Sequence, residues 1–129
     1  MQELFIALIE DDEDDVGLMT DCFKKQSSFS IKSFSSGQEF LDYPMNGNLP
    51  CLFIVDLNLP DIRGLDLVEQ IRLNSGLADV PVFIYTTDYT RHEAKACEEL
   101  NIQLLKKPDS LQEWDKIAAA MLQYCNTGL

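Results

Sequence analysis

The sequence predicts a doubly wound α/β fold, in which helices cover both faces of a five-stranded parallel sheet. Five short apolar runs recur along the chain, and each is too short to be a typical helix. Amphipathic helical patterns lie between these runs. Because parallel strands need crossover connections, which are nearly always right-handed, this alternation implies a parallel sheet.

The five apolar runs give the predicted strands, which are residues 4–9, 31–34, 51–55, 82–85 and 103–105. The first helical pattern places Val16, Met19 and Phe23 on one face. The last pattern does the same with Leu111, Trp114, Ala118, Met121 and Cys125. Three helix starts carry a capping box, in which a hydroxyl side chain and a later glutamate satisfy unpaired backbone amides: Ser36 with Glu39, Thr90 with Glu93, and Ser110 with Glu113.

Length and charge restrict the function classes. A chain of 129 residues is about one domain long, and residues 126–129 are too few for a further module, so we expect one domain with no attached effector domain. The formal net charge of -12 opposes binding to nucleic acid or to an anionic membrane surface. The N-terminus resembles no secretory signal, and no apolar stretch is long enough to span a bilayer, so we expect a cytoplasmic location.

The four cysteines are Cys22, Cys51, Cys97 and Cys125. They lie far apart in the sequence and show neither a CxxC motif nor the Cys/His spacing of a metal site. We therefore expect all four to be reduced core residues.

Acidic residues follow the first and third predicted strands. Ligands of doubly wound sheets bind beyond the carboxyl ends of the strands, and in the flavodoxin-like order 2-1-3-4-5 the first and third strands are neighbours. Glu10 and Asp11 follow the first strand, so Asp56 after the third should meet them in one crevice. Crowded carboxylates need a compensating cation, and hard oxygen ligands suit Mg²⁺. We expect the other acids after the first strand, residues 13–15, simply to stabilise the start of a helix.

Donor groups follow the fourth and fifth strands. Thr86 ends the fourth strand and Lys107 follows the fifth, where a hydroxyl and an ammonium would face the carboxylates. Three carboxylates balanced by Mg²⁺ and one lysine would leave the resting pocket neutral, and an added phosphoryl group would make it negative. The pattern therefore predicts a phosphoryl site whose charge change is absorbed by movement.

With the acidic pair, the DxNxP motif from Asp56, the threonine and the Lys-Pro pair in this order, the chain resembles the receiver domain of two-component response regulators over its whole length. The resemblance implies that Asp56 accepts a phosphoryl group. It also implies that Mg²⁺ is bound directly by Asp11, largely through water by Glu10, and further by Asp56 and the backbone carbonyl of Asn58. It also implies that Thr86 and Lys107 hold the phosphoryl oxygens and that the bond before Pro108 is cis.

The implied donor is the phosphohistidine of a sensor histidine kinase or histidine phosphotransfer protein, and the implied output is a downstream protein target. The surface formed by the fourth helix, fifth strand and fifth helix would carry the signal. The resemblance further implies that the chain catalyses its own phosphorylation and dephosphorylation and is not otherwise an enzyme.

Leu104 departs from the family pattern, in which a switching aromatic residue that couples to the threonine usually stands three residues before the lysine. Tyr85 is a possible substitute, although strand alternation points it away from that face. A degenerate receiver, acting as a protein-interaction module without phosphorylation, remains an alternative. A topoisomerase-primase nucleic-acid domain is another candidate, but it would leave Thr86 and Lys107 without a role. A flavodoxin-like FMN carrier shares the topology, but the acidic first loop of this chain would repel the phosphate of FMN.

Overall fold

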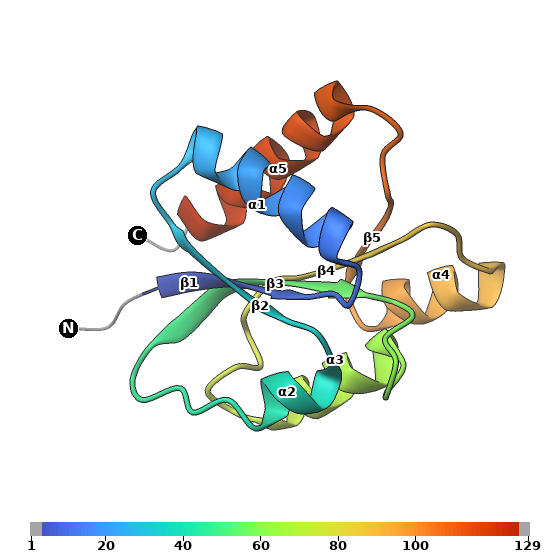
Figure 1. Cartoon of the computed structure of the whole chain (residues 1–129). Coiled ribbons are helices and arrows are strands. Elements are labelled where there is room, and N and C mark those ends of the chain that lie inside the picture. The colour runs from blue at the N-terminus through green and yellow to red at the C-terminus, as the bar shows by residue number, and fades with distance from the viewer. Residues whose placement is uncertain (1–3, 127–129) are drawn as a thin grey trace.

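The computed structural model describes residues 4–126, so the short tail expected after the last helix lies largely outside this range. Its core is a five-stranded parallel sheet in the order β2-β1-β3-β4-β5, as the sequence predicts (Figure 1). The strands are β1 (Leu4–Ile9), β2 (Ser30–Phe34), β3 (Leu49–Asp56), β4 (Val82–Thr86) and β5 (Gln103–Lys106). All five predicted strands are present, and β3 begins two residues earlier than predicted.

Within residues 4–126, five helices cover the sheet in two layers. They are α1 (Glu13–Gln26), α2 (Gly37–Leu41), α3 (Gly64–Leu73), α4 (Arg91–Glu99) and α5 (Leu111–Asn126). Helices α1 and α5 pack on one face, and α2, α3 and α4 pack on the other (Figure 1). The predicted three-layer architecture is confirmed.

The central strands are buried on both faces, and their side chains alternate between two cores. From β1, Phe5, Ala7 and Ile9 join the core beneath α2, α3 and α4, while Ile6 and Leu8 join the core beneath α1 and α5. This period of two follows from the pleat of a strand. Apolar runs without polar interruption are what a two-sided parallel sheet requires.

Side-chain caps form at the three helix starts where the sequence predicts them, those of α2, α4 and α5. Thr90 and Glu93 form the full predicted capping box of α4. At α2, the Glu39 amide donates to Ser36, but the Glu39 carboxylate turns to Ser35, so only half of that predicted box forms. These contacts satisfy backbone amides that have no partner inside the helix.

The cysteine prediction is wrong for one pair. Cys51 of β3 and Cys125 of α5 form a disulfide, with their Cα atoms 5.1 Å apart. The two residues are 74 positions apart, and only the packing of α5 across the sheet brings them together. Cys22 and Cys97 are buried free thiols, as predicted, and burial raises the pKa of Cys22 to about 11.

Among residues 4–126, every peptide bond is trans, including the bond before Pro108 for which the resemblance implies cis. This agrees with the ordinary trans preference of X–Pro bonds. No helix in the same range combines the length and apolar composition needed to cross a bilayer.

Candidate functional site

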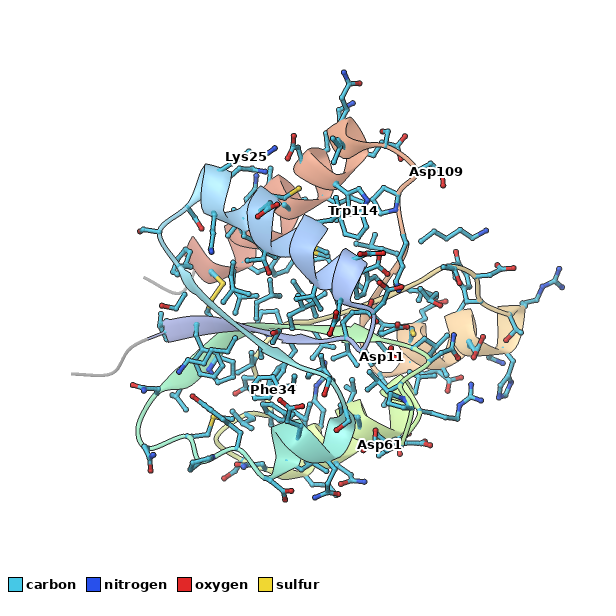
Figure 2. All side chains as sticks on the ribbon, viewed as in Figure 1. Asp11, Lys25, Phe34, Asp61, Asp109 and Trp114 are labelled. Atoms are coloured by element: carbon cyan, nitrogen blue, oxygen red, sulfur yellow. A yellow bond between two sulfur atoms is a disulfide. The ribbon has the colours of Figure 1, made fainter. Side chains whose placement is uncertain are left out.

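The carboxyl ends of four neighbouring strands meet at one edge of the sheet. Glu10 follows β1, Asp56 is the last residue of β3, Thr86 is the last of β4, and Lys107 follows β5. The parallel arrangement makes this convergence unavoidable, because all four strands run in one direction. Figure 2 shows Asp11 at this edge, where the loops that follow the strands gather.

Three carboxylates lie close enough to share one cation. One oxygen each from Glu10, Asp11 and Asp56 lies within 4.8 Å of the others. Glu10 and Asp56 are buried, with 2% and 6% of their surface exposed, whereas Asp11 is exposed. Glu10 and Asp56 are therefore shielded from solvent, and the group is accessible to solvent on the side of Asp11.

Lys107 reaches into this group from β5. Its Nζ lies 2.8 Å from Glu10 Oε1 and 3.2 Å from Asp56 Oδ2. Burial lowers the pKa of Lys107, but bonding to the Asp15 and Glu10 carboxylates outweighs burial and holds the pKa above its usual value. The lysine is thus a fixed positive charge in contact with the two buried carboxylates.

Asp15 corrects the prediction that residues 13–15 serve only the helix start. From the first turn of α1, its Oδ2 lies 2.7 Å from Lys107 Nζ, closer than the Glu10 and Asp56 oxygens that the lysine also contacts. Asp15 is therefore a fourth carboxylate beside the three that could share a cation, and the predicted charge balance of the pocket did not include it. The helix cap itself is Asp12, which accepts from the amides of Asp14 and Asp15.

Tyr85 is the second residue that the sequence prediction missed. It points away from the α3 and α4 side, as strand alternation predicts, and its hydroxyl donates a 2.7 Å hydrogen bond to Glu10 Oε1. Burial and the adjacent Asp56 carboxylate raise the pKa of Glu10, while Lys107 and Tyr85 oppose the shift. One signal was available in the sequence: a buried tyrosine hydroxyl needs a polar partner.

Hydrogen bonds hold Asn58 and Thr86 in place at the rim of the site. The backbone amide of Asn58, in the loop after β3, donates a 3.0 Å hydrogen bond to Asp56 Oδ1 and so holds that carboxylate in place. The Thr86 hydroxyl donates to the Asp88 carbonyl at 3.0 Å and lies 3.4 Å from the Asn58 side-chain nitrogen. Leu104, in the position of the expected aromatic, is half-buried against the core beneath α4.

Gly64 sets the path of the loop after Asp56. A Cβ atom built on Gly64 would collide with the backbone carbonyl oxygen of Asp56 and would lie 2.9 Å from the Cα of Leu57. The Gly64 amide also donates to the Leu57 carbonyl at 2.8 Å. Only glycine allows α3 to begin this close to the end of β3.

The donor set fits a hard divalent cation. Three carboxylates supply oxygen ligands, the exposed side leaves room for water, and the described residues place no His or Cys in this group. Mg²⁺ prefers such sites, with one or two carboxylates and several waters. The negative charge that Lys107 leaves uncompensated would favour the ion.

Comparison with known proteins decides the family. The response regulator receiver domain family matches residues 6–118. The chain belongs to this family. Its receiver fold aligns with the crystal structure of a two-component response regulator from Legionella pneumophila, with 31% identity, a TM-score of 0.76, and coverage of 94% of this chain and 99% of that one.

Other relatives are more distant in sequence. The phosphorylated cyanobacterial phytochrome response regulator RcpA covers all of this chain and 97% of its own, with a TM-score of 0.83 at 20% identity, which shows the fold alone. The Mn²⁺-bound form of another response regulator has a TM-score of 0.78 at 24% identity, covering 92% of this chain and 90% of its own.

Among curated proteins, the transcriptional regulatory protein SrrA of Staphylococcus aureus is 34% identical over 65 residues. That match includes 50% of this chain but only 27% of SrrA. The receiver family acts in two-component signalling, where receivers bind Mg²⁺ or Mn²⁺ at an acidic pocket and interact with histidine kinases and downstream effectors. Membership in this family overturns the topoisomerase-primase alternative.

Proposed function

We propose that this receiver domain accepts a phosphoryl group on Asp56. The observation that carries the proposal is the position of the Asp56 carboxylate, which is buried among acids, 3.2 Å from Lys107 and open to one side. A carboxylate that only braced a loop would not need a second carboxylate and a lysine in contact with it.

Glu10, Asp11 and Asp56 would hold Mg²⁺, and the backbone carbonyl of Asn58 would complete the protein ligands. Bound Mg²⁺ would offset negative charge on the oxygens of the transferred group. A similar solved structure is the Mn²⁺-bound form of a response regulator, which supports a divalent ion in this family.

The transfer begins with attack by an Asp56 oxygen on the phosphorus of a phosphohistidine. The new O–P bond forms as the P–N bond breaks, and the electron pair returns to the imidazole of the donor. Lys107 and Thr86 would contact the phosphoryl oxygens from β5 and β4. Water later attacks the acyl phosphate and returns Asp56 to a carboxylate.

Thr86 links this chemistry to a surface. Its hydroxyl now donates to Asp88, so it must leave that carbonyl to reach a phosphoryl oxygen on Asp56. Such a movement would pull the segment that leads into α4 and alter the face made by α4, β5 and α5. This is a local charge change that biases a two-state element.

The expected partners are a sensor histidine kinase or a histidine phosphotransfer protein as donor, and a downstream protein as target. We further propose that the protein acts in the cytoplasm and catalyses only its own phosphorylation and dephosphorylation. The net charge of -12 supports protein partners over nucleic acid.

Intact mass spectrometry with Mg²⁺ and acetyl phosphate tests the proposal. Wild type should gain the mass of one phosphoryl group, and Asp56→Asn should gain none. Asp66→Asn, which removes an exposed acid in the first turn of α3, is the matched control and should react like wild type. An unreactive wild-type protein would favour the degenerate receiver, which acts without phosphorylation.

A further inference from the structure

Tyr85 connects the acidic site to the core beneath α1 and α5. Only 1% of its surface is exposed, and its hydroxyl donates to Glu10 Oε1 at 2.7 Å. Lys107 Nζ lies 4.9 Å from the centre of its ring, and the ring of Trp114 packs edge-on at 6.2 Å. The ring of Tyr85 is therefore packed against Trp114 of α5, and its hydroxyl is bonded to Glu10 of the acidic site.

Glu10 receives donors from three separate segments. Oε1 accepts from Tyr85 on β4 and contacts the Lys107 ammonium after β5. Oε2 accepts from the amide of Asp12, in the loop after β1, at 3.2 Å. A carboxylate held from three directions has little freedom to rotate, so its orientation toward the neighbouring carboxylates is set before any cation binds.

We propose that Tyr85 is a positioning residue for the metal site: its hydroxyl fixes the Glu10 carboxylate and, through the shared oxygen, the Lys107 ammonium. This inference rests on the proposed function, because it assigns a role within the same pocket. Outer hydrogen-bond partners of metal ligands orient those ligands, and their loss typically weakens metal binding ~10- to 100-fold.

A purely structural role for Tyr85 would have a different signature. An aromatic residue with a purely structural role contributes to the core through its ring, and Phe has the same ring. In that case any acceptor would satisfy the tyrosine hydroxyl equally well. Here the acceptor is one of the three carboxylates that lie close enough to share a cation. Tyr85→Phe keeps the ring on Trp114 and removes only the contact to Glu10.

Calorimetric titration with Mg²⁺ tests the inference without relying on phosphorylation. Tyr85→Phe should bind Mg²⁺ about 10-fold or more weakly than wild type. The matched control is Tyr43→Phe, which also removes a hydroxyl bonded to a charged side chain, that of Lys32 at 2.6 Å. Tyr43 is partly buried against the core on the opposite face of the sheet. This control should bind Mg²⁺ like wild type.

A double-mutant cycle asks whether Tyr85 acts through Glu10. In a Glu10→Gln background, Tyr85→Phe should weaken Mg²⁺ binding much less than it does in wild type, because the two changes remove parts of one interaction. Equal losses in both backgrounds would refute the positioning role. If Tyr85→Phe does not fold, tyrosine-labelled NMR of wild type replaces it: Mg²⁺ should shift the Tyr85 resonances, and unmoved resonances would refute the role.

Failure of this inference is distinguishable from failure of the proposed function. Wild-type protein that gains a phosphoryl group while Tyr85→Phe keeps wild-type Mg²⁺ affinity would remove only the role of Tyr85. Wild-type protein that binds Mg²⁺, with Tyr85→Phe weakened, but never gains a phosphoryl group would keep the positioning role and reject the function.

Discussion

Reduction of the Cys51–Cys125 disulfide should lower stability by a calculable amount. The bond joins residues 74 positions apart, and closing a loop of that length in the unfolded chain corresponds to about 4 kcal/mol. For a chain of 129 residues, the usual unfolding entropy converts this into a fall in Tm of about 15 °C. Cys125 is 3% exposed in the folded state, so its packing should survive reduction.

Thermal unfolding with and without a reductant measures this fall. Alkylation followed by mass spectrometry establishes the starting state, because the non-reduced protein should expose two thiols on unfolding, those of Cys22 and Cys97. The double variant Cys51→Ala/Cys125→Ala is the control and should be insensitive to reductant. A verified disulfide whose reduction leaves Tm unchanged would refute the entropic reasoning, and four free thiols before reduction would refute the bond itself.

Three further substitutions test the site. Gly64→Ala should lower the free energy of unfolding by about 1–3 kcal/mol, measured in urea, because the new methyl group collides with the Asp56 carbonyl. Asp15→Asn should raise the initial rate of phosphorylation by acetyl phosphate about 5-fold, equivalent to ~1 kcal/mol, because it releases Lys107 and removes a repelling charge. Thr86→Ala should still accept a phosphoryl group but lose about 1 kcal/mol of stability with its hydrogen bond.

Specific results would contradict each expectation. An unchanged urea midpoint for Gly64→Ala would mean that the loop after β3 has room for a side chain. A slower reaction in Asp15→Asn would mean that Asp15 assists the lysine instead of competing for it. A Thr86→Ala protein that no longer accepts a phosphoryl group would place the hydroxyl in the transfer step and not only in the switch.

The fold could be predicted because the two sequence periodicities are strong. The apolar runs of β1, β3 and β4 have no polar interruption, which is the pattern of strands buried on both faces. Strand β5 has half-buried and exposed residues, as expected of an edge strand, yet the Lys-Pro pair after it marks its end. Boundary errors at β3 arise because Pro50 lies beside a register shift that the local pattern does not reveal.

The site could be predicted where residues directly follow strands. Glu10, Asp56, Thr86 and Lys107 are placed by the sheet alone, so knowing the strand order was sufficient. Asp15 could not be assigned in the same way, because its contact with Lys107 depends on how α1 leans over the end of β5.

Tyr85 and the disulfide were missed for a related reason. The Tyr85 hydroxyl reaches Glu10 past β3, which separates β4 from β1 in the sheet, so this contact depends on how the whole core packs. The disulfide depends on the angle of α5 across the sheet, which no local pattern encodes.

Because cytoplasmic reductants keep most thiols reduced, the alkylation experiment also bears on the proposed location.

Chemical localisation of the phosphoryl group tests most directly whether Asp56 is the acceptor in this metal-dependent pocket. Borohydride reduces an acyl phosphate to an alcohol, so after treatment with acetyl phosphate and Mg²⁺ the peptide that contains Asp56 should carry homoserine at that position. Chelation of Mg²⁺ before the reaction should leave aspartate there. Homoserine at Asp11 or Asp15 instead, or at Asp56 regardless of Mg²⁺, would contradict the assignment.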